Sequence, residues 1–352
     1  MSSAAKPSVC IVMATHNPEP RFFRKQVESI RTQSHSSWSC LIQDDGSSEE
    51  AYREIRREIG TDSRFGIHRN RQRLGVYHCF EMALAGVTKS TDLVCLADQD
   101  DIWLPHKVER LAGEFADPSV QLVHSDLSVI DECDAVTHPS CWALEKRNVH
   151  NARSIHLLLL RNVVTGCASM LRRDLLDTAL PFPAQGVIPA FFHDLWLALI
   201  ASARGKIVSL PEPLVLYRSH SGNTLGPLEK GLVRDLRKFA AGYPRYLSRE
   251  YLDETLRHSR QEWDERRELS VALRERLRLA RSRGTPVILP RVDLFNTFPD
   301  FGVSSLVLTG LSLAFRHHAL APAVRLCLGK AQRDLRLSSL IPSYMDPPCS
   351  QG

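Results

Sequence analysis

Three carboxylates crowd into four residues of this chain, at Asp98-Gln99-Asp100-Asp101, directly after the apolar stretch 93–97. Like charges this close repel one another and lower stability unless a cation or hydrogen-bond donors neutralise them. Carboxylate oxygens are hard ligands that suit Mg²⁺ or Mn²⁺, and these ions share their coordination with substrate phosphates. The cluster therefore predicts a divalent-metal site. Asp101 has a second interpretation, because an Asp at this position could also cap the next helix.

A second acidic loop, Asp44-Asp45-Gly46-Ser47, also follows an apolar stretch. Its glycine permits a tight turn, and its Asp or Ser side chains can accept hydrogen bonds from a base, a ribose or backbone amides. An Asp-Gly turn alone would be ordinary. Together, the two acidic loops at strand ends predict a nucleotide held between them.

The elements that must position these loops appear up to about residue 130, where short apolar stretches alternate with amphipathic segments. This alternation is typical of an α/β fold with a mainly parallel sheet flanked by helices. In such sheets ligands bind beyond the carboxyl ends of the strands, which is where both loops fall. The expected strands are Val9–Ala14, Trp38–Gln43, Phe65–His68, Asp92–Ala97 and Gln121–His124. The expected helices are Arg21–Thr32, Glu49–Ile59, Tyr77–Gly86 and Pro105–Phe115.

The later sequence loses this alternation. We assign residues 1–226 to one catalytic domain, with a nucleotide-binding half at about 8–130 and an acceptor-binding half at about 131–226. Residues 227–352 are expected to form a mostly helical C-terminal extension. Its apolar stripe at helical spacing favours packing on the domain or on a partner over a membrane role: Leu269, Leu273, Leu277 and Ala280. The segment Phe301–Leu340 is a candidate interfacial helix.

Composition narrows the class of protein. A formal net charge of +5 and a pI near 8.7 are only mildly basic and give little support for nucleic-acid binding. Nine scattered cysteines without a C-x-x-C pair predict reduced structural thiols in a cytoplasmic protein. The sequence shows neither a signal-peptide pattern nor an apolar stretch long enough to span a membrane. We therefore expect a cytoplasmic enzyme, either soluble or peripheral at the inner face of the cell membrane.

The order and spacing of several motifs resemble the family-2 glycosyltransferases, which share the GT-A fold and are mostly inverting enzymes. The resemblance covers about residues 8–226. It rests on Val12-Met13-Ala14-Thr15-His16-Asn17-Pro18, Gln43-Asp44-Asp45-Gly46-Ser47, Leu74-Gly75, Asp98-Gln99-Asp100-Asp101-Ile102-Trp103, Thr165-Gly166 and His193-Asp194-Leu195-Trp196. Three segments look most like rhamnosyltransferase-type members that act on bacterial surface polysaccharides. They are Asp98-Gln99-Asp100-Asp101-Ile102-Trp103, His193-Asp194-Leu195-Trp196 and Tyr217-Arg218-Ser219-His220-Ser221-Gly222-Asn223.

The resemblance implies roles on the donor side. A nucleotide-sugar donor would meet Thr15, Asn17, Asp45, Asp98 and Gln99. The metal that bridges the diphosphate, Mg²⁺ or Mn²⁺, would bind Asp100. His220 would be a second metal or diphosphate contact, and its alternative is an ordinary exposed loop histidine.

On the acceptor side, the resemblance makes Asp194 the general base that removes the proton of the attacking hydroxyl. A positioned carboxylate serves because the hydroxyl acidifies only as the new bond forms. The leaving diphosphate needs no proton donor where a metal neutralises its charge. An N-cap role for Asp194 is the alternative, and capping does not exclude catalysis. Gly166, His193 and Trp196 would contact the acceptor, a saccharide or a lipid-linked saccharide.

The chain also departs from the family pattern. Arg73 and Cys79 stand where many relatives have asparagines around Leu-Gly, and Arg73 could meet the donor diphosphate or be a solvated surface residue. His193 stands where many relatives have Glu before the base, so its effect on the acceptor site is left open.

Three hypotheses follow. The first is a metal-dependent inverting hexosyltransferase, with rhamnose as a candidate sugar and surface polysaccharide biosynthesis as its setting. The second is a non-catalytic nucleotide-sugar-binding module with the same fold, against which the presence of both Asp100 and Asp194 argues. The third is a nucleotidyltransferase, disfavoured because no Gly-rich phosphate loop followed by Lys stands near the N-terminus.

Overall fold

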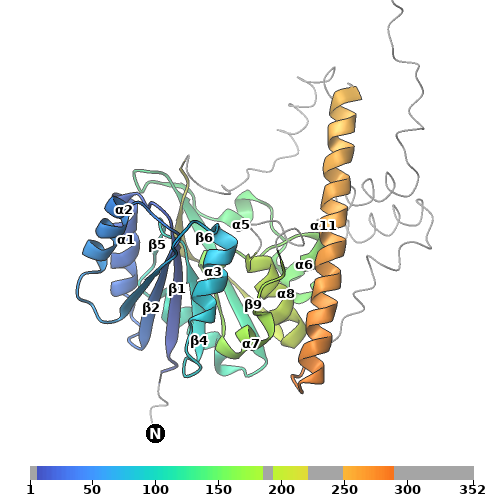
Figure 1. Cartoon of the computed structure of the whole chain (residues 1–352), viewed down its shortest axis with the longest axis horizontal. Coiled ribbons are helices and arrows are strands. Elements are labelled where there is room, and N and C mark those ends of the chain that lie inside the picture. Colours follow the sequence, from blue (N-terminus) through green and yellow to red (C-terminus); the bar gives the residue numbers. More distant parts are fainter. Residues whose placement is uncertain (1–5, 185–192, 221–248, 289–352) are drawn as a thin grey trace, which may run out of the picture. The chain divides into compact units, whose positions relative to one another are not determined.

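The computed structural model of the chain describes residues 6–184, 193–220 and 249–288. They form an α/β fold around a nine-stranded mixed sheet with the order β3-β2-β1-β4-β8-β6-β9-β5, in which β7 pairs with β6 (Figure 1). This confirms the predicted fold class. Among the described helices, none is long and apolar enough to cross a membrane.

The first half of the sheet consists of four parallel strands, β3-β2-β1-β4, as expected for βα units. Their register aligns the carboxyl ends: Thr15 lies opposite Asp44, which in turn lies opposite Arg69. The loops after β1, β2 and β4 therefore emerge at one edge. The bounds are Val9–Thr15 for β1, Trp38–Asp44 for β2, Phe65–Arg69 for β3 and Leu93–Ala97 for β4.

Helices cover the strands close to where the sequence predicts them. α1 packs against α2, whereas α3 packs across β1 and β2 (Figure 1). The side chain of Ser48 caps α2 by accepting from the Ala51 amide at 3.2 Å. The bounds are Pro20–Arg31 for α1, Glu49–Ile59 for α2, Val76–Ala85 for α3 and Lys107–Gly113 for α4, which continues into the 3-10 turn Glu114–Ala116.

The second half of the sheet differs from the prediction. The expected short strand Gln121–His124 is the centre of an eleven-residue strand, β6, which is buried along its whole length. The other four strands of this half, β5, β7, β8 and β9, were not predicted. In β9, Pro211 and Pro213 interrupt the apolar pattern, and the register shifts where Asp126 faces Pro213, because proline cannot donate to the ladder. The bounds are Val120–Ile130 for β6, Ser169–Arg172 for β8, Lys206–Arg218 for β9, Ile102–Trp103 for β5 and Val136–His138 for β7.

Short helices connect these strands. The segment from β7 to β8 contains α5 and α6, and that from β8 to β9 contains α7 and α8. The bounds are Cys141–Leu144 for α5, Ile155–Leu160 for α6, Leu176–Ala179 for α7 and His193–Arg204 for α8, with a 3-10 turn at Gly166–Ala168.

Internal contacts divide the chain into two compact units, residues 1–230 with 269–292 and residues 231–268 with 293–352. The long helix α11, Arg249–Ser282, contributes its second half to the first unit. The predicted apolar stripe of that half is buried, which confirms a packing role: Leu269, Leu273, Leu277 and Ala280. The domain boundary at 226 stays a prediction, and Phe301–Leu340 lies outside the described residues.

Candidate active site

The loops after β1 and β2 form one hydrogen-bonded unit. Thr15 Oγ1 donates to Asp44 Oδ1 at 3.1 Å, and the Asp45 amide donates to the Thr15 carbonyl at 2.7 Å. Asn17 has a left-handed backbone, with φ of 42°, that Asn tolerates better than most residues. Its amide donates to Ser47 Oγ at 2.8 Å. Thr15, Asn17 and Asp45 are thus brought together, as the sequence predicts.

Asp45 anchors a third loop, between β3 and α3. Its Oδ1 accepts from Asn70 Nδ2 at 2.9 Å and from the Leu74 amide at 2.8 Å, and its Oδ2 accepts from the Gly75 amide at 2.8 Å. Both carboxylate oxygens therefore bind the chain's own donors. A contact between Asp45 and a nucleoside stays a prediction.

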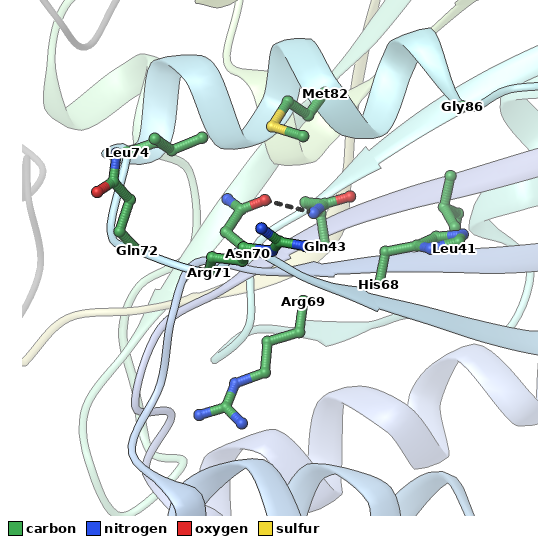
Figure 2. A pocket seen from close by; sticks show the side chains of 10 residues that line it. All are labelled: Leu41, Gln43, His68, Arg69, Asn70, Arg71, Gln72, Leu74, Met82 and Gly86. Atoms are coloured by element: carbon green, nitrogen blue, oxygen red, sulfur yellow. Dashed lines mark hydrogen bonds between the residues drawn. The ribbon is translucent and has the colours of Figure 1, made fainter.

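The same loop borders a cavity of about 480 Å³ between α3 and the strands β2 and β3, of which β3 is the edge strand (Figure 2). On its floor Gln43 Nε2 donates to Asn70 Oδ1 at 2.8 Å. Arg73 is exposed and is not part of this lining. Its backbone amide nitrogen would lie 3.1 Å from a Cβ at Gly46, so the turn at Gly46 requires glycine. The lining residues are Leu41, Gln43, His68, Arg69, Asn70, Arg71, Gln72, Leu74, Met82 and Gly86.

Gln99 joins the acidic loop after β4 to the loop after β1. Its Oε1 accepts from the His16 amide at 2.8 Å, and its Nε2 donates to the His16 carbonyl at 3.4 Å. The side-chain amide of Gln99 thus holds two strand-end loops at a fixed separation.

A buried lysine lies beneath the acidic loop. Lys107 Nζ donates to the Cys167 carbonyl at 2.6 Å and lies 3.1 Å from the centre of the Trp103 ring. Burial, followed by the charge of Asp100, raises the pKa of Asp98 to about 6, while Lys107 acts in the opposite direction. Lys107 therefore offsets part of the negative charge that the sequence places here.

The Asp100 carboxylate contacts His220 Nε2 at 2.9 Å, and both side chains are 16% exposed. Asp100 and His220 thus lie together, and metal binding by them stays a prediction. Asp98, Asp101 and Cys167 also present ligand atoms within 4.8 Å of one another. Burial, followed by Asp101, raises the pKa of the Cys167 thiol well above its usual range. A thiol is also a soft ligand, which suits Mg²⁺ or Mn²⁺ less well than oxygen does.

Asp101 supplies the observation that fits a cation best, because its buried Oδ2 has no hydrogen-bond partner among the described residues. Carboxylate oxygens with one imidazole form a donor set that suits Mg²⁺ or Mn²⁺. The residues present thus fit a divalent metal at this loop.

Arg218, at the end of β9, is a residue whose part in the site the sequence analysis missed. Its side chain is fully buried. Its amide donates to Asp101 Oδ1 at 3.1 Å, and its Nε donates to the Asp100 carbonyl at 2.9 Å. Nη1 pairs with Asp134 at 2.6 Å, which ties the loop after β6 to the acidic loop. Its place two residues before His220 was the available signal.

Asp194 lies at the start of α8, next to the turn at Gly166. A Cβ at Gly166 would lie 3.0 Å from His193 Nε2 and 3.7 Å from Asp194 Cβ, so glycine lets the two segments approach. Burial raises the pKa of Asp194 to about 7, against the lowering effect of the Leu195 amide and of Arg147. Asp194 Oδ1 accepts from that amide at 2.7 Å. Such a carboxyl is half ionised near neutral pH.

The neighbours of Asp194 on α8 are packed in the core. His193 stacks on Phe80 of α3 at 4.2 Å between ring centres, and burial lowers its pKa to about 4. Trp196 is fully buried, and its indole donates to the Ala179 carbonyl at 2.8 Å. The structure thus gives Trp196 a packing contact. An acceptor contact of Gly166, His193 or Trp196 stays a prediction.

The loops after β1, β2 and β4 all lie within a segment that matches a known protein family. Residues 10–180 match the family model of Glycosyl transferase family 2. An uncharacterized glycosyltransferase of Nostoc sp. is 25% identical over 222 residues, which are 61% of this chain and 66% of that protein. The Escherichia coli protein WfgD is 24% identical over 193 residues, which are 54% of this chain and 69% of WfgD. WfgD is a UDP-Glc:α-D-GlcNAc-diphosphoundecaprenol β-1,3-glucosyltransferase.

A solved structure resembles the chain over most of its length. It is residues 1–349 of TarS from S. aureus in complex with UDP-GlcNAc, with a TM-score of 0.50 and 12% identity. The match covers 93% of this chain and 92% of that one. At this identity the likeness is one of fold.

Proposed function

We propose that the protein is an inverting, metal-dependent glycosyltransferase that moves a sugar from a nucleoside-diphosphate donor to an acceptor hydroxyl. The observation that supports it most is the placement of one partly exposed carboxyl, Asp194, with a pKa raised to about 7 by burial. A general base works best when its pKa lies near the working pH. The match of residues 10–180 to Glycosyl transferase family 2 supports this reaction class.

The catalytic base lies at the start of α8, whereas the donor and metal contacts lie on the loops at the strand ends and at His220. Asp194 accepts the proton of the acceptor hydroxyl as that oxygen attacks the anomeric carbon from the face opposite the leaving group. Thr15, Asn17 and Asp45 hold the nucleoside at the ends of β1 and β2, with Asp98 completing this contact. A divalent metal bound by Asp100 and His220 would supply the positive charge that stabilises a leaving diphosphate.

Two further contacts complete the donor side. Gln99 maintains the spacing between the loops after β1 and β4 and so shapes the nucleoside contact. Arg73, exposed on the neighbouring loop, meets the donor diphosphate, because a guanidinium can bind a phosphate with two parallel hydrogen bonds.

The acceptor is a saccharide or a lipid-linked saccharide, as it is for WfgD. A lipid-linked acceptor would bring the enzyme to the cytoplasmic face of a membrane as a peripheral protein. For the donor sugar, the motifs favour rhamnose, whereas the named relative uses UDP-Glc. A panel of nucleotide sugars tested for protection against thermal unfolding would identify the donor, because a ligand that binds only the folded state raises its stability.

The base assignment is tested with Asp194→Asn. We expect transfer to fall by at least ~100-fold, since general bases contribute about this much or more. Donor binding, measured by calorimetry with and without Mn²⁺, should stay within about twofold. The matched control is Asp174→Asn, because Asp174 is an exposed carboxylate that pairs with Arg204 at the other end of α8. Retained transfer in Asp194→Asn would exclude it as the base.

A further inference from the structure

Arg147, in the segment after α5, is held in one orientation by acceptors from two parts of the chain. Its side chain is 13% exposed, and its Nε pairs with Glu145 Oε2 at 2.8 Å. Its Nη1 donates to Thr165 Oγ1 at 2.7 Å and to the Val163 carbonyl at 3.3 Å. A guanidinium bound on both sides of its fork has little freedom to turn.

The turn that Arg147 holds borders Asp194. Thr165 precedes Gly166, and the Gly166 backbone lies close enough to α8 that a Cβ there would be 3.7 Å from Asp194 Cβ. Arg147 can therefore act on Asp194 in two ways. It fixes the turn that borders this carboxyl, and its positive charge favours the ionised carboxylate.

We propose that Arg147 is a positioning residue for the reaction, which anchors the 165–166 turn against Asp194 and keeps that carboxyl available as the base. This inference rests on the proposed function, in which Asp194 is the base. It adds a residue that the family motifs found in the sequence do not include.

The charges around Asp194 support this role. Burial raises the pKa of Asp194, the Leu195 amide and then Arg147 lower it, and Asp98 raises it. Burial lowers the pKa of His193, the residue before Asp194, to about 4, so this ring is neutral at pH 7. Arg147 is thus a cation that keeps Asp194 available as a base, in opposition to burial and to Asp98.

The test compares pH profiles of transfer for the wild type, Arg147→Gln and Arg147→Lys. Loss of the charge in Arg147→Gln should move the acid limb of kcat/KM to higher pH by about one unit, since a nearby opposite charge shifts a carboxyl pKa by about this much or more. Arg147→Lys should keep the limb near its original pH, because the charge remains. A lower kcat in this variant would report the lost anchoring of Thr165.

The matched control is Arg204→Gln. Arg204 is 10% exposed, pairs with Asp174 at 2.7 Å and lies on the same helix, α8. Ten residues separate it from Asp194, which is about 15 Å along a helix. Its loss should leave the acid limb unchanged. An acid limb that does not move in Arg147→Gln would overturn the inference.

Two further measurements cover the remaining cases. Infrared titration of the Asp194 carboxyl, identified by its absence in Asp194→Asn, follows the same shift without any assay of transfer. Should Arg147→Gln not fold, Glu145→Gln tests a shift of the opposite sign. In this variant Arg147 keeps its charge but loses its counter-charge, so the Asp194 carboxyl should titrate at lower pH. A shift to higher pH contradicts the inference. Transfer retained in Asp194→Asn would reject the proposed base, whereas the infrared titration would still decide whether Arg147 controls its charge.

Discussion

At the residue scale, the site consists of acidic side chains held by the chain's own donors and cations. Asp45 is bound by two backbone amides and Asn70, and Lys107 lies under the acidic loop. Asp194 differs, because burial outweighs its donors and its pKa is raised to about 7. Ionising such a carboxyl in the folded protein lowers the free energy of unfolding, and this loss grows with pH.

Asp194→Asn should therefore stabilise the protein at high pH. The folded-state pKa of Asp194 is raised above its unfolded value of about 3.9, so its contribution to stability is fully present below pH 4 and is lost as pH rises through 7. Because the side chain is partly exposed, we expect the variant to be more stable than the wild type by on the order of 2 kcal/mol at pH 8. Urea unfolding at pH 4 and pH 8 measures the difference. An equal difference at both pH values would show that the charge of Asp194 is not its cause.

At the scale of elements, the turn at Gly166 controls how closely α8 approaches the sheet. In Gly166→Ala the new methyl would lie 3.0 Å from His193 Nε2, and His193 cannot move freely because it stacks on Phe80. We expect a loss of about 1–3 kcal/mol, as is usual for overpacking of a filled core. Transfer should fall further than donor binding, because the strain lies beside Asp194.

Gly113→Ala is the matched control, since a Cβ at Gly113, also a helical residue, meets nothing within 4 Å. Urea unfolding, calorimetry with the donor and a transfer assay compare the two variants. A Gly166→Ala enzyme with wild-type stability and transfer would show that the turn can accommodate a methyl group at this position.

The elements also show how far the sequence could predict the fold. The strands β1, β2 and β4 were predictable because each is a short, mainly apolar stretch next to a helix in the sequence. β9 was not, because its two prolines break that pattern and its pairing with β6 depends on contacts far along the chain. Its residue Arg218 was missed for a related reason: a basic residue is expected at the surface, and only the fold shows that it binds the acidic loop.

In the candidate site, too, the local sequence predicts some features, and others exist only in the folded chain. The acidic loops could be located from the sequence because their residues are adjacent. The pairing of Asp100 with His220 joins residues far apart in the sequence, and the motif resemblance alone suggested it. Arg147 gave no signal, because its relation to Asp194 passes through Thr165 and exists only in the folded chain.

At the scale of the whole molecule, the first compact unit includes residues from the C-terminal region. Arg276 of α11 donates to the carbonyls of Thr178, Ala179 and Pro181 at distances from 2.6 to 3.1 Å. The Ala179 carbonyl also accepts from the indole of Trp196 on α8. The second half of α11 is therefore part of the structure that supports the helix of the proposed base.

Leu273→Ala tests this dependence. Leu273 is fully buried, so its truncation leaves a cavity and should cost about 2–5 kcal/mol. The matched control is Leu279→Ala on the same helix, because Leu279 is 46% exposed and its truncation should change stability by less than about 0.5 kcal/mol. Thermal and urea unfolding of the full chain measure both. If the second half of α11 folds with the sheet, Leu273→Ala lowers the midpoint of one cooperative transition. A separate early transition, with the main one unchanged, would show instead that this half unfolds independently and that α8 does not need it.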